Sequence, residues 1–299
     1  MSARENKRAD KLSALRTLVF RFARRRNFRH CPENQMALSA SKKTDAIAKA
    51  LALVTAAAGI AVAIPALDSE NLEVALIALA AAASVAAACR QLPLQNVLLA
   101  AGFAALIGGV AHGLSANANL AMPFGLLTFN PNAGAKIFNA VPWTVPLLWI
   151  FALLNSRGVA RLILRPWRKQ KNYGYIVIGL TAFLAVGFDL ALEPFAAHVK
   201  HFWLWQPTKF PWHWHGASPL NFFGWFCVTL LMLAFATPSL IKKQPGSSGA
   251  PDLFSVALWF GAVLLFAIGA AKAGFWSAVI LDAVLAGVVA VFGWRGAKW

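Results

Sequence analysis

Charged residues are scarce in this chain. Of its 299 residues, 59% are hydrophobic and only 13% are charged, whereas about a quarter of the residues in an average soluble domain carry charge. Several apolar runs reach the roughly 20 residues that a helix needs to cross a bilayer core, with almost no charge inside them. The composition therefore excludes an ordinary soluble fold and predicts a membrane protein.

Cysteines are also few. Cys31, Cys89 and Cys227 stand alone, without a CxxC or similar spacing. This isolation gives no indication of a disulfide framework or of a cysteine metal site. Because apolar residues surround Cys89 and Cys227, we expect both to be buried as small hydrophobic side chains.

Acidic residues are outnumbered by basic ones, 11 against 28, and the formal net charge is +17. A basic face on a soluble domain would indicate nucleic acid. Here, however, twelve of the 28 basic residues precede residue 45, and most of the others lie in short loops between apolar runs. Anionic lipid is a sufficient partner for such residues, so the pattern predicts contact with membrane lipids and no nucleic-acid binding.

The beginning of the chain lacks the clean apolar stretch of a cleavable signal peptide, because Arg21 and the arginines at 24–26 interrupt it. Residues 1–44 are predicted to be a basic cytoplasmic arm, disordered or lying on the membrane surface. Residues 45–299 are predicted to form the transmembrane domain. Met36 is a second plausible start, and the sequence leaves open whether Met1 or Met36 begins the protein.

The apolar runs, and the Pro, Gly, Asn and Asp residues that separate them, predict an all-α fold, a polytopic transmembrane helix bundle with about eight spans. No internal repeat is visible. The predicted spans are 45–65, 71–89, 94–114, 141–163, 174–192, 219–240, 253–271 and 275–293.

Lysine and arginine in short loops set the orientation of the bundle. Arg90, the basic cluster at 157–171, the pair at 242–243 and the C-terminal tail all fall on one side of an eight-span arrangement. That side is predicted to be the cytoplasm, with both termini in it and the protein multi-pass in the inner (plasma) membrane. Two long connections, at 115–140 and 193–218, are then expected to meet at the outer face.

Ionisable residues inside a membrane are costly and indicate function. Asp189 and Glu193 are four residues apart at the end of the fifth predicted span, so they share one face of a helix. Two carboxyl groups so close in a low-dielectric site do not both ionise readily, which makes one of them available as a general acid. Alternatively, the pair binds Lys200 or a histidine and holds the following loop in place. Asp282, in the last span, is a second candidate acid or a structural group, and His112 is similarly ambiguous.

The second long connection is rich in histidine and tryptophan. Four histidines within 18 residues could bind iron or zinc, since imidazole is the commonest metal ligand, although their spacing falls short of the histidine boxes of membrane di-iron enzymes. The tryptophans fit either an interfacial aromatic belt or the lining of a site for a long apolar ligand. The histidines are His198, His201, His213 and His215.

Several motifs occur together and in order. They read Asp-Leu-x-x-Glu-Pro at 189–194, Trp-x-Trp at 203–205 and Asn-Phe-x-Gly-Trp at 221–225, with Pro-Phe-Gly at 123–125 and a proline-rich helix start at 141–149 upstream. Together they resemble the CruF-like carotenoid biosynthesis family of integral-membrane carotenoid hydratases. The chain departs from that pattern at His112, where relatives tend to have a glutamate, and at two positions where tyrosine pairs are usual.

What the resemblance implies is a carotenoid hydratase, a lyase of the hydro-lyase type, that adds water to the terminal C=C bond of an acyclic carotenoid end group without a cofactor. Its substrate would be a carotenoid or another polyene lipid. Protonation of the alkene gives a tertiary cation, which water captures. The catalytic residues implied are Asp189, Glu193 and Asn221. The substrate-binding residues implied are Phe124, Trp149, Trp203, Trp205 and Trp225.

Two other functions remain open at this point. One is a different lipid or polyene enzyme on the same scaffold, metal-dependent through the histidine cluster, which metal analysis of the purified protein would reveal. The other is a non-catalytic carotenoid-binding membrane protein, which would leave the mass of the pigment unchanged.

Overall fold

The structure is a computed structural model that describes residues 32–64, 67, 69–241 and 251–299. Contacts divide the chain into two units, residues 1–43 and residues 44–299. The first unit contributes, among its described residues, the beginning of a helix. All of the residues of the candidate functional site belong to the second unit.

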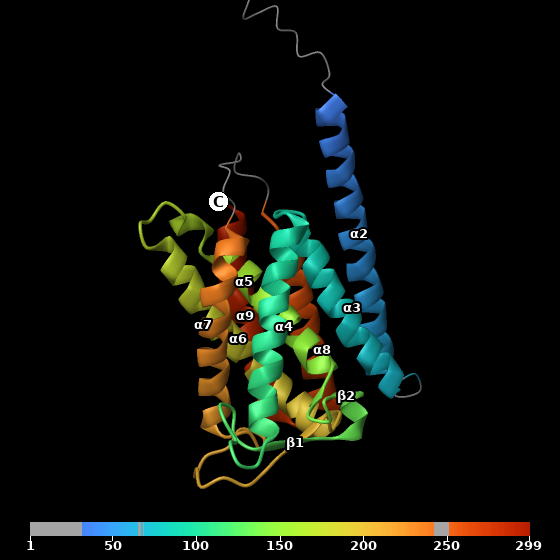
Figure 1. Ribbon diagram of the computed structural model, residues 1–299, viewed down its shortest axis with the longest axis vertical. Coiled ribbons are helices and arrows are strands. Elements are labelled where there is room, and N and C mark those ends of the chain that lie inside the picture. Colours follow the sequence, from blue (N-terminus) through green and yellow to red (C-terminus); the bar gives the residue numbers. More distant parts are fainter. Residues whose placement is uncertain (1–31, 65–66, 68, 242–250) are drawn as a thin grey trace, which may run out of the picture. The chain divides into compact units, whose positions relative to one another are not determined.

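Helices account for most of the described chain, and short strands occur only between them (Figure 1). In chain order the elements are α2 (Pro32–Ala63), α3 (Glu70–Cys89), α4 (Leu94–Ala116), β1 (Leu127–Phe129), η1 (Pro131–Ala133), β2 (Lys136–Ile137), β3 (Val141–Pro142), α5 (Thr144–Ile163), η2 (Arg165–Trp167), α6 (Tyr173–Pro194), η3 (Phe195–Val199), β4 (Trp203–Trp205), α7 (Pro219–Leu240), α8 (Phe254–Lys272) and α9 (Trp276–Ala297).

Eight helices of the described chain are long and apolar enough to cross a membrane. The all-α, eight-span bundle predicted from hydropathy is therefore confirmed, and the protein is a multi-pass membrane protein. Two boundaries differ by more than a few residues. Helix α2 begins at Pro32, because helix geometry continues through polar residues that a hydropathy signal does not include. The fifth span runs on to Val199 through a π-helical turn, η3.

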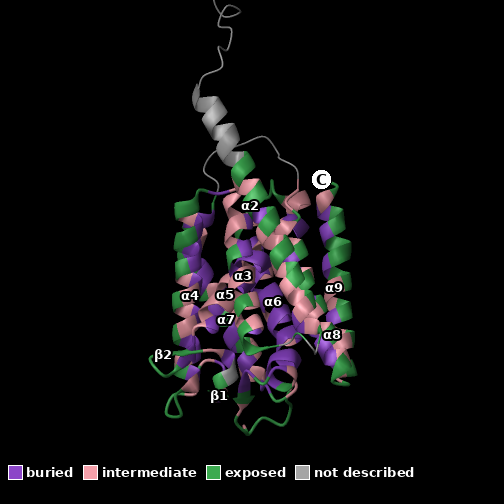
Figure 2. Cartoon of the chain, turned by 90° about the vertical axis from the view of Figure 1, so that its right-hand side faces the viewer, coloured by how far each residue is buried: buried purple, intermediate pink, exposed green. Residues whose placement is uncertain are grey.

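Helix α5 lies at the centre of the bundle and packs against α3, α4, α6, α8 and α9. In the most apolar 18-residue stretch of α5, 61% of the residues are buried. The corresponding share is 56% in the α6 span and 11% in α2. Figure 2 shows the same contrast between the buried inner helices and the exposed outer faces. The exposed faces remain apolar, as expected for helices whose solvent is lipid.

Two long connections meet at one end of the bundle, which we call the loop end and define by residues 117–143 and 200–218. Strand β1 pairs antiparallel with β4, with Phe129 opposite Trp203 and Leu127 opposite Trp205. A second short sheet joins β2 to β3. Because β1 and β4 come from different connections, their pairing fixes one connection against the other.

Basic residues gather at the opposite end of the bundle. The Arg90 guanidinium lies 2.8 Å from a carboxylate oxygen of Asp45 and 2.8 Å from one of Asp252, so it joins α2 and the residues just after α3 to those just before α8. The Arg157 side chain donates to the Leu240 carbonyl oxygen at 2.7 Å. These charged groups hold the ends of the helices together where the bilayer gives way to water.

The prediction that both apolar cysteines are buried is wrong for Cys227, which is exposed on α7, while Cys89 is half-buried. In a soluble protein an apolar neighbourhood usually indicates the core. In a bilayer the outer surface is equally apolar, so hydropathy alone does not distinguish the two. Cys31 lies outside the described residues.

Candidate functional site

Two buried carboxyl groups lie side by side near the loop end of α6. Asp189 is 0% and Glu193 is 1% exposed, and their spacing of four residues places them on one helical face. The amide nitrogen of Asn221, in the first turn of α7, donates to Asp189 Oδ2 at 2.6 Å and to Glu193 Oε1 at 3.3 Å. The three predicted catalytic residues therefore form one hydrogen-bonded group, Asp189–Asn221–Glu193, which we call the carboxyl site.

Strand β4 covers the carboxyl site from the loop end. Side chains two residues apart on a strand point to the same face, and the indole N–H groups of Trp203 and Trp205 both donate to Glu193 Oε2, at 3.3 and 2.8 Å. Leu204, between them, is exposed. The Trp-x-Trp motif thus has a direct structural reason: strand alternation delivers two donors to one carboxylate oxygen.

One carboxyl oxygen of the site takes no part in these hydrogen bonds. Asp189 Oδ1 is buried and has no hydrogen-bond partner within the described residues. A buried carboxylate oxygen without a partner is energetically costly. Two adjacent carboxylates that share one amide donor also repel each other if both are ionised, and a single proton held between them removes that repulsion. The arrangement can therefore hold and release a proton.

The remaining aromatic candidates form a packed cluster beneath the carboxyl site. The rings of Trp149 and Trp225 stack with centroids 3.8 Å apart, and Phe124 lies 4.4 Å from the ring of His112. The Trp149 indole N–H donates to His112 Nδ1 at 3.1 Å. Trp225 follows Asn221 by one helical turn on α7, so this cluster and the carboxyl site share a face of that helix.

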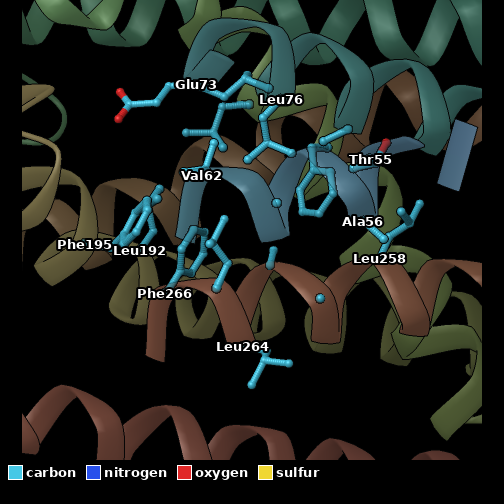
Figure 3. A pocket seen from close by; sticks show the side chains of 18 of the residues that line it. Thr55, Ala56, Val62, Glu73, Leu76, Leu192, Phe195, Leu258, Leu264 and Phe266 are labelled. Atoms are coloured by element: carbon cyan, nitrogen blue, oxygen red, sulfur yellow. The ribbon is translucent and has the colours of Figure 1, made fainter. Parts of the chain in front are cut away.

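A cavity of about 720 Å³ lies on the neighbouring face of α6 (Figure 3). It is enclosed by α2, α3, α5, α6 and α8, and almost all of its lining is apolar. Ile60 on α2 and Leu264 on α8 line it and are also 65% and 61% exposed at the surface of the protein. The cavity therefore reaches the lipid-facing surface between these helices.

The cavity and the carboxyl site adjoin but do not coincide. Phe188 and Leu192 of α6 line the cavity, whereas Asp189 and Glu193 are not among its lining residues. Trp203 belongs to both, because it lines the cavity and donates to Glu193. Of the five aromatic residues expected to bind substrate, Trp203 alone lines this cavity. Phe124, Trp149 and Trp225 pack against one another instead.

Glu73 and Lys200 form an ion pair that sequence reasoning missed. The Lys200 ammonium lies 2.6 Å from Glu73 Oε1, and both residues are buried and line the cavity. The sequence left open a pairing of Asp189 and Glu193 with Lys200 or a histidine; the partner of Lys200 in this ion pair is a residue of α3. The sequence gave only a weak indication of this ion pair, namely an acidic residue in the first turn of a predicted span.

The four clustered histidines point to different partners. His198 Nε2 donates to the His215 carbonyl oxygen at 2.8 Å, and His201 Nδ1 donates to the Ala197 carbonyl oxygen at 3.2 Å. His213 Nε2 contacts Thr208 Oγ1 at 2.9 Å, and His215 Nε2 contacts Ser277 Oγ at 3.1 Å. Burial, with a smaller contribution from His198, lowers the pKa of His215. Across the described chain, no group of three or more His, Cys, Asp or Glu side chains is placed to hold a metal ion.

Asp282 is separate from the carboxyl site. It is 1% exposed on α9, and neither of its carboxylate oxygens has a hydrogen-bond partner in the part of the chain that the structure describes. It therefore takes no part in the Asp189–Asn221–Glu193 network.

A family model described as carotenoid biosynthesis protein matches residues 72–289, well over half of the chain. The chain belongs to the carotenoid biosynthesis protein family. The carboxyl site, the aromatic cluster and the Glu73–Lys200 pair all lie within the matched region of this family member, whereas α2 lies before it. Comparison with the curated proteins and with the solved structures finds no significant match.

Membership of the carotenoid biosynthesis family agrees with the apolar lining of the cavity. Carotenoids are long, apolar polyenes, and a membrane protein reaches them most directly from the lipid phase. A cavity that is almost entirely apolar and reaches the surface between α2 and α8 suits such a molecule.

Proposed function

We propose that this family member is a hydratase that adds water to the terminal C=C bond of an acyclic carotenoid end group. The observation that carries the proposal is the carboxyl site, in which one amide bridges two buried carboxyl groups and two indole N–H groups bind one of them. Alkene hydration needs a group that gives up a proton and a base that takes one back. The carboxyl site supplies both.

The reaction balances without a cofactor. A carboxylic acid of the site transfers its proton to the less substituted carbon of the terminal double bond, and a tertiary cation forms on the other carbon. The oxygen of a water molecule bonds to that cation, and a proton of the water returns to the carboxylate. The product is a tertiary alcohol, and the site regains its starting protonation.

Trp203 is suited to connect substrate binding with this chemistry. Its ring lines the cavity, and its N–H donates to Glu193. An aromatic face stabilises a nearby cation by about 0.5–2 kcal/mol or more, depending on how dry the site is. An apolar chain in the cavity would bring its end to Trp203, and a shift of that side chain would open the way to the carboxyl site.

The decisive test replaces each carboxyl group by its amide in a host that makes lycopene, an acyclic carotenoid. Asp189→Asn and Glu193→Gln keep the size and much of the hydrogen bonding but remove the ionisable proton. At least one of them should lose about 10² to 10⁴ in hydration rate, the usual effect of a lost general acid. Mass spectrometry of the extracted pigment counts the waters added.

Asp282→Asn is the matched control, because Asp282 is an equally buried carboxyl group outside the site. It should hydrate the pigment at nearly the wild-type rate. Near wild-type activity in both Asp189→Asn and Glu193→Gln would exclude the carboxyl site as the source of the proton. A wild-type protein that binds the pigment and leaves its mass unchanged would instead identify a non-catalytic carotenoid-binding protein.

A further inference from the structure

The cavity has one polar end. Glu73 and Lys200 are the only charged residues among those that line it within the described chain. Figure 3 shows the Glu73 carboxylate at one end of the row of apolar side chains. Since Glu73 is in the first turn of α3 and Lys200 immediately follows η3, this polar end is at the loop end of the bundle.

Stability alone is a weak reason for an ion pair in this position. Taking two charges out of water is costly, and replacing a buried pair by apolar side chains is often neutral or stabilising. Glu73 and Lys200 are 8% and 9% exposed and lie beside an apolar cavity. Such a pair is better explained if it also meets a polar group of whatever occupies that cavity.

The charges of the pair select the chemistry of that group. The ion pair is neutral overall, so a charged end would meet a like charge as well as an opposite one, whereas a hydroxyl is neutral and can donate to the carboxylate while accepting from the ammonium. The two lining threonines already use their hydroxyl protons, Thr55 toward the Leu51 carbonyl and Thr144 toward the Ala133 carbonyl.

We propose that this cavity binds a polyene that carries a hydroxyl at one end, with the hydroxyl beside the Glu73–Lys200 pair, in hydrogen-bond reach of both groups, and the apolar chain extending along α2 and α8. The inference rests on the proposed function for the identity of the ligand, because a tertiary alcohol is what alkene hydration leaves behind. The cavity would then hold either the product or a polyene whose other end is still to react.

The proposal is tested by measuring, in lipid nanodiscs, how tightly the protein binds two probes. One is parinaryl alcohol, a linear conjugated tetraene alcohol, and the other is its methyl ether. The two probes share the same fluorescent chain, but the ether cannot donate to Glu73. The wild-type protein should bind the alcohol about tenfold more tightly, as expected when a hydrogen bond to a charged group is lost. Equal affinities for the alcohol and the ether would overturn the proposal.

Three variants locate the binding. Glu73→Leu combined with Lys200→Met removes both charges together, so no buried charge is left alone, and should abolish the preference for the alcohol. Gly261→Phe should weaken the binding of both probes. Gly261 lines the cavity and a Cβ there meets nothing within 4 Å, so the new side chain would occupy part of the cavity. Gly102→Phe, at an exposed glycine of α4 with equally open space, should bind as the wild type does.

Either of two results with these proteins would also refute the proposal. One is a Gly261→Phe protein that binds both probes with wild-type affinity. The other is displacement of the tetraene by diacylglycerol at a lower concentration than by the unlabelled polyene alcohol, which would assign the cavity to membrane lipid. Because the assay measures binding without turnover, its failure is distinguishable from failure of the hydratase proposal: Asp189→Asn should still bind the alcohol.

Discussion

Gly224 is the point at which two of the sequence motifs meet in space. A Cβ at this position would lie 2.7 Å from Phe124 Cδ1 and 2.7 Å from the Pro123 carbonyl oxygen. Phe124 is fully buried, and its N–H donates to Ser115 Oγ at 3.0 Å. The Pro-Phe-Gly loop and the Asn-Phe-x-Gly-Trp helix start therefore pack backbone to backbone, which requires glycine on α7.

Gly224→Ala should consequently destabilise the protein. The added methyl group meets a backbone carbonyl that cannot move without displacing Phe124, and overpacking of this kind costs about 1–3 kcal/mol. This exceeds the gain of about 0.5–1 kcal/mol from replacing glycine by alanine within a helix. The midpoint of thermal unfolding in detergent should fall. Gly102→Ala, where nothing lies within 4 Å of the new Cβ, is the control and should not lower it. Equal midpoints for the two variants would contradict the packing argument.

The catalytic candidates differ in how far sequence could identify them. The spacing of Asp189 and Glu193 predicts a shared helical face, and the structure has them there. The position of Asn221 followed from a motif resemblance rather than from any rule of spacing. The Glu73–Lys200 pair joins residues far apart in the chain, and such a choice of partner depends on tertiary packing that local patterns do not contain.

At the scale of elements, three-residue strands organise the site. The indole N–H groups of Trp203 and Trp205 reach Glu193 because strand β4, which carries both residues, is paired with β1. The sequence predicts both tryptophans on a long loop and predicts that the two connections meet. It did not predict the strands, because so short a run carries too little alternation to be distinguished from a loop. The long helices, by contrast, were predicted to within a few residues at most of their ends.

Trp205→Phe tests the function of that strand. The ring is kept, but one N–H donor to Glu193 is lost, and a hydrogen bond to a charged group is worth about 1.5–3 kcal/mol. Hydration per folded molecule should slow by about 10- to 100-fold, and the melting temperature should fall only by the amount expected for one lost hydrogen bond. Leu204→Val changes the neighbouring, exposed face and should leave the rate unchanged. A Trp205→Phe protein with full activity would show that this donor has no catalytic role.

At the scale of the whole chain, the two ends of the bundle carry different chemistry. From the second half of α5 to the start of α6 the chain has six basic residues within 157–171 and no acidic one. The loop end instead carries the two long connections, the carboxyl site and the polar end of the cavity. The positive-inside rule predicts that the basic end faces the cytoplasm. On that prediction the carboxyl site would lie in the opposite leaflet, and a polyene would reach it from that side.

Reporter fusions decide this orientation. Fusions after Lys171 and after Arg295 should report the cytoplasm, whereas fusions within the two long connections, at Pro131 and Thr208, should report the outer side. The physical reason is that lysine and arginine close to the ends of spans resist translocation far more than acidic residues do. Alkaline phosphatase and green fluorescent protein give opposite signals on the two sides, so each position is measured twice. If Lys171 and Thr208 gave the same readout, α6 would not cross the membrane, and the carboxyl site could not lie within a spanning helix.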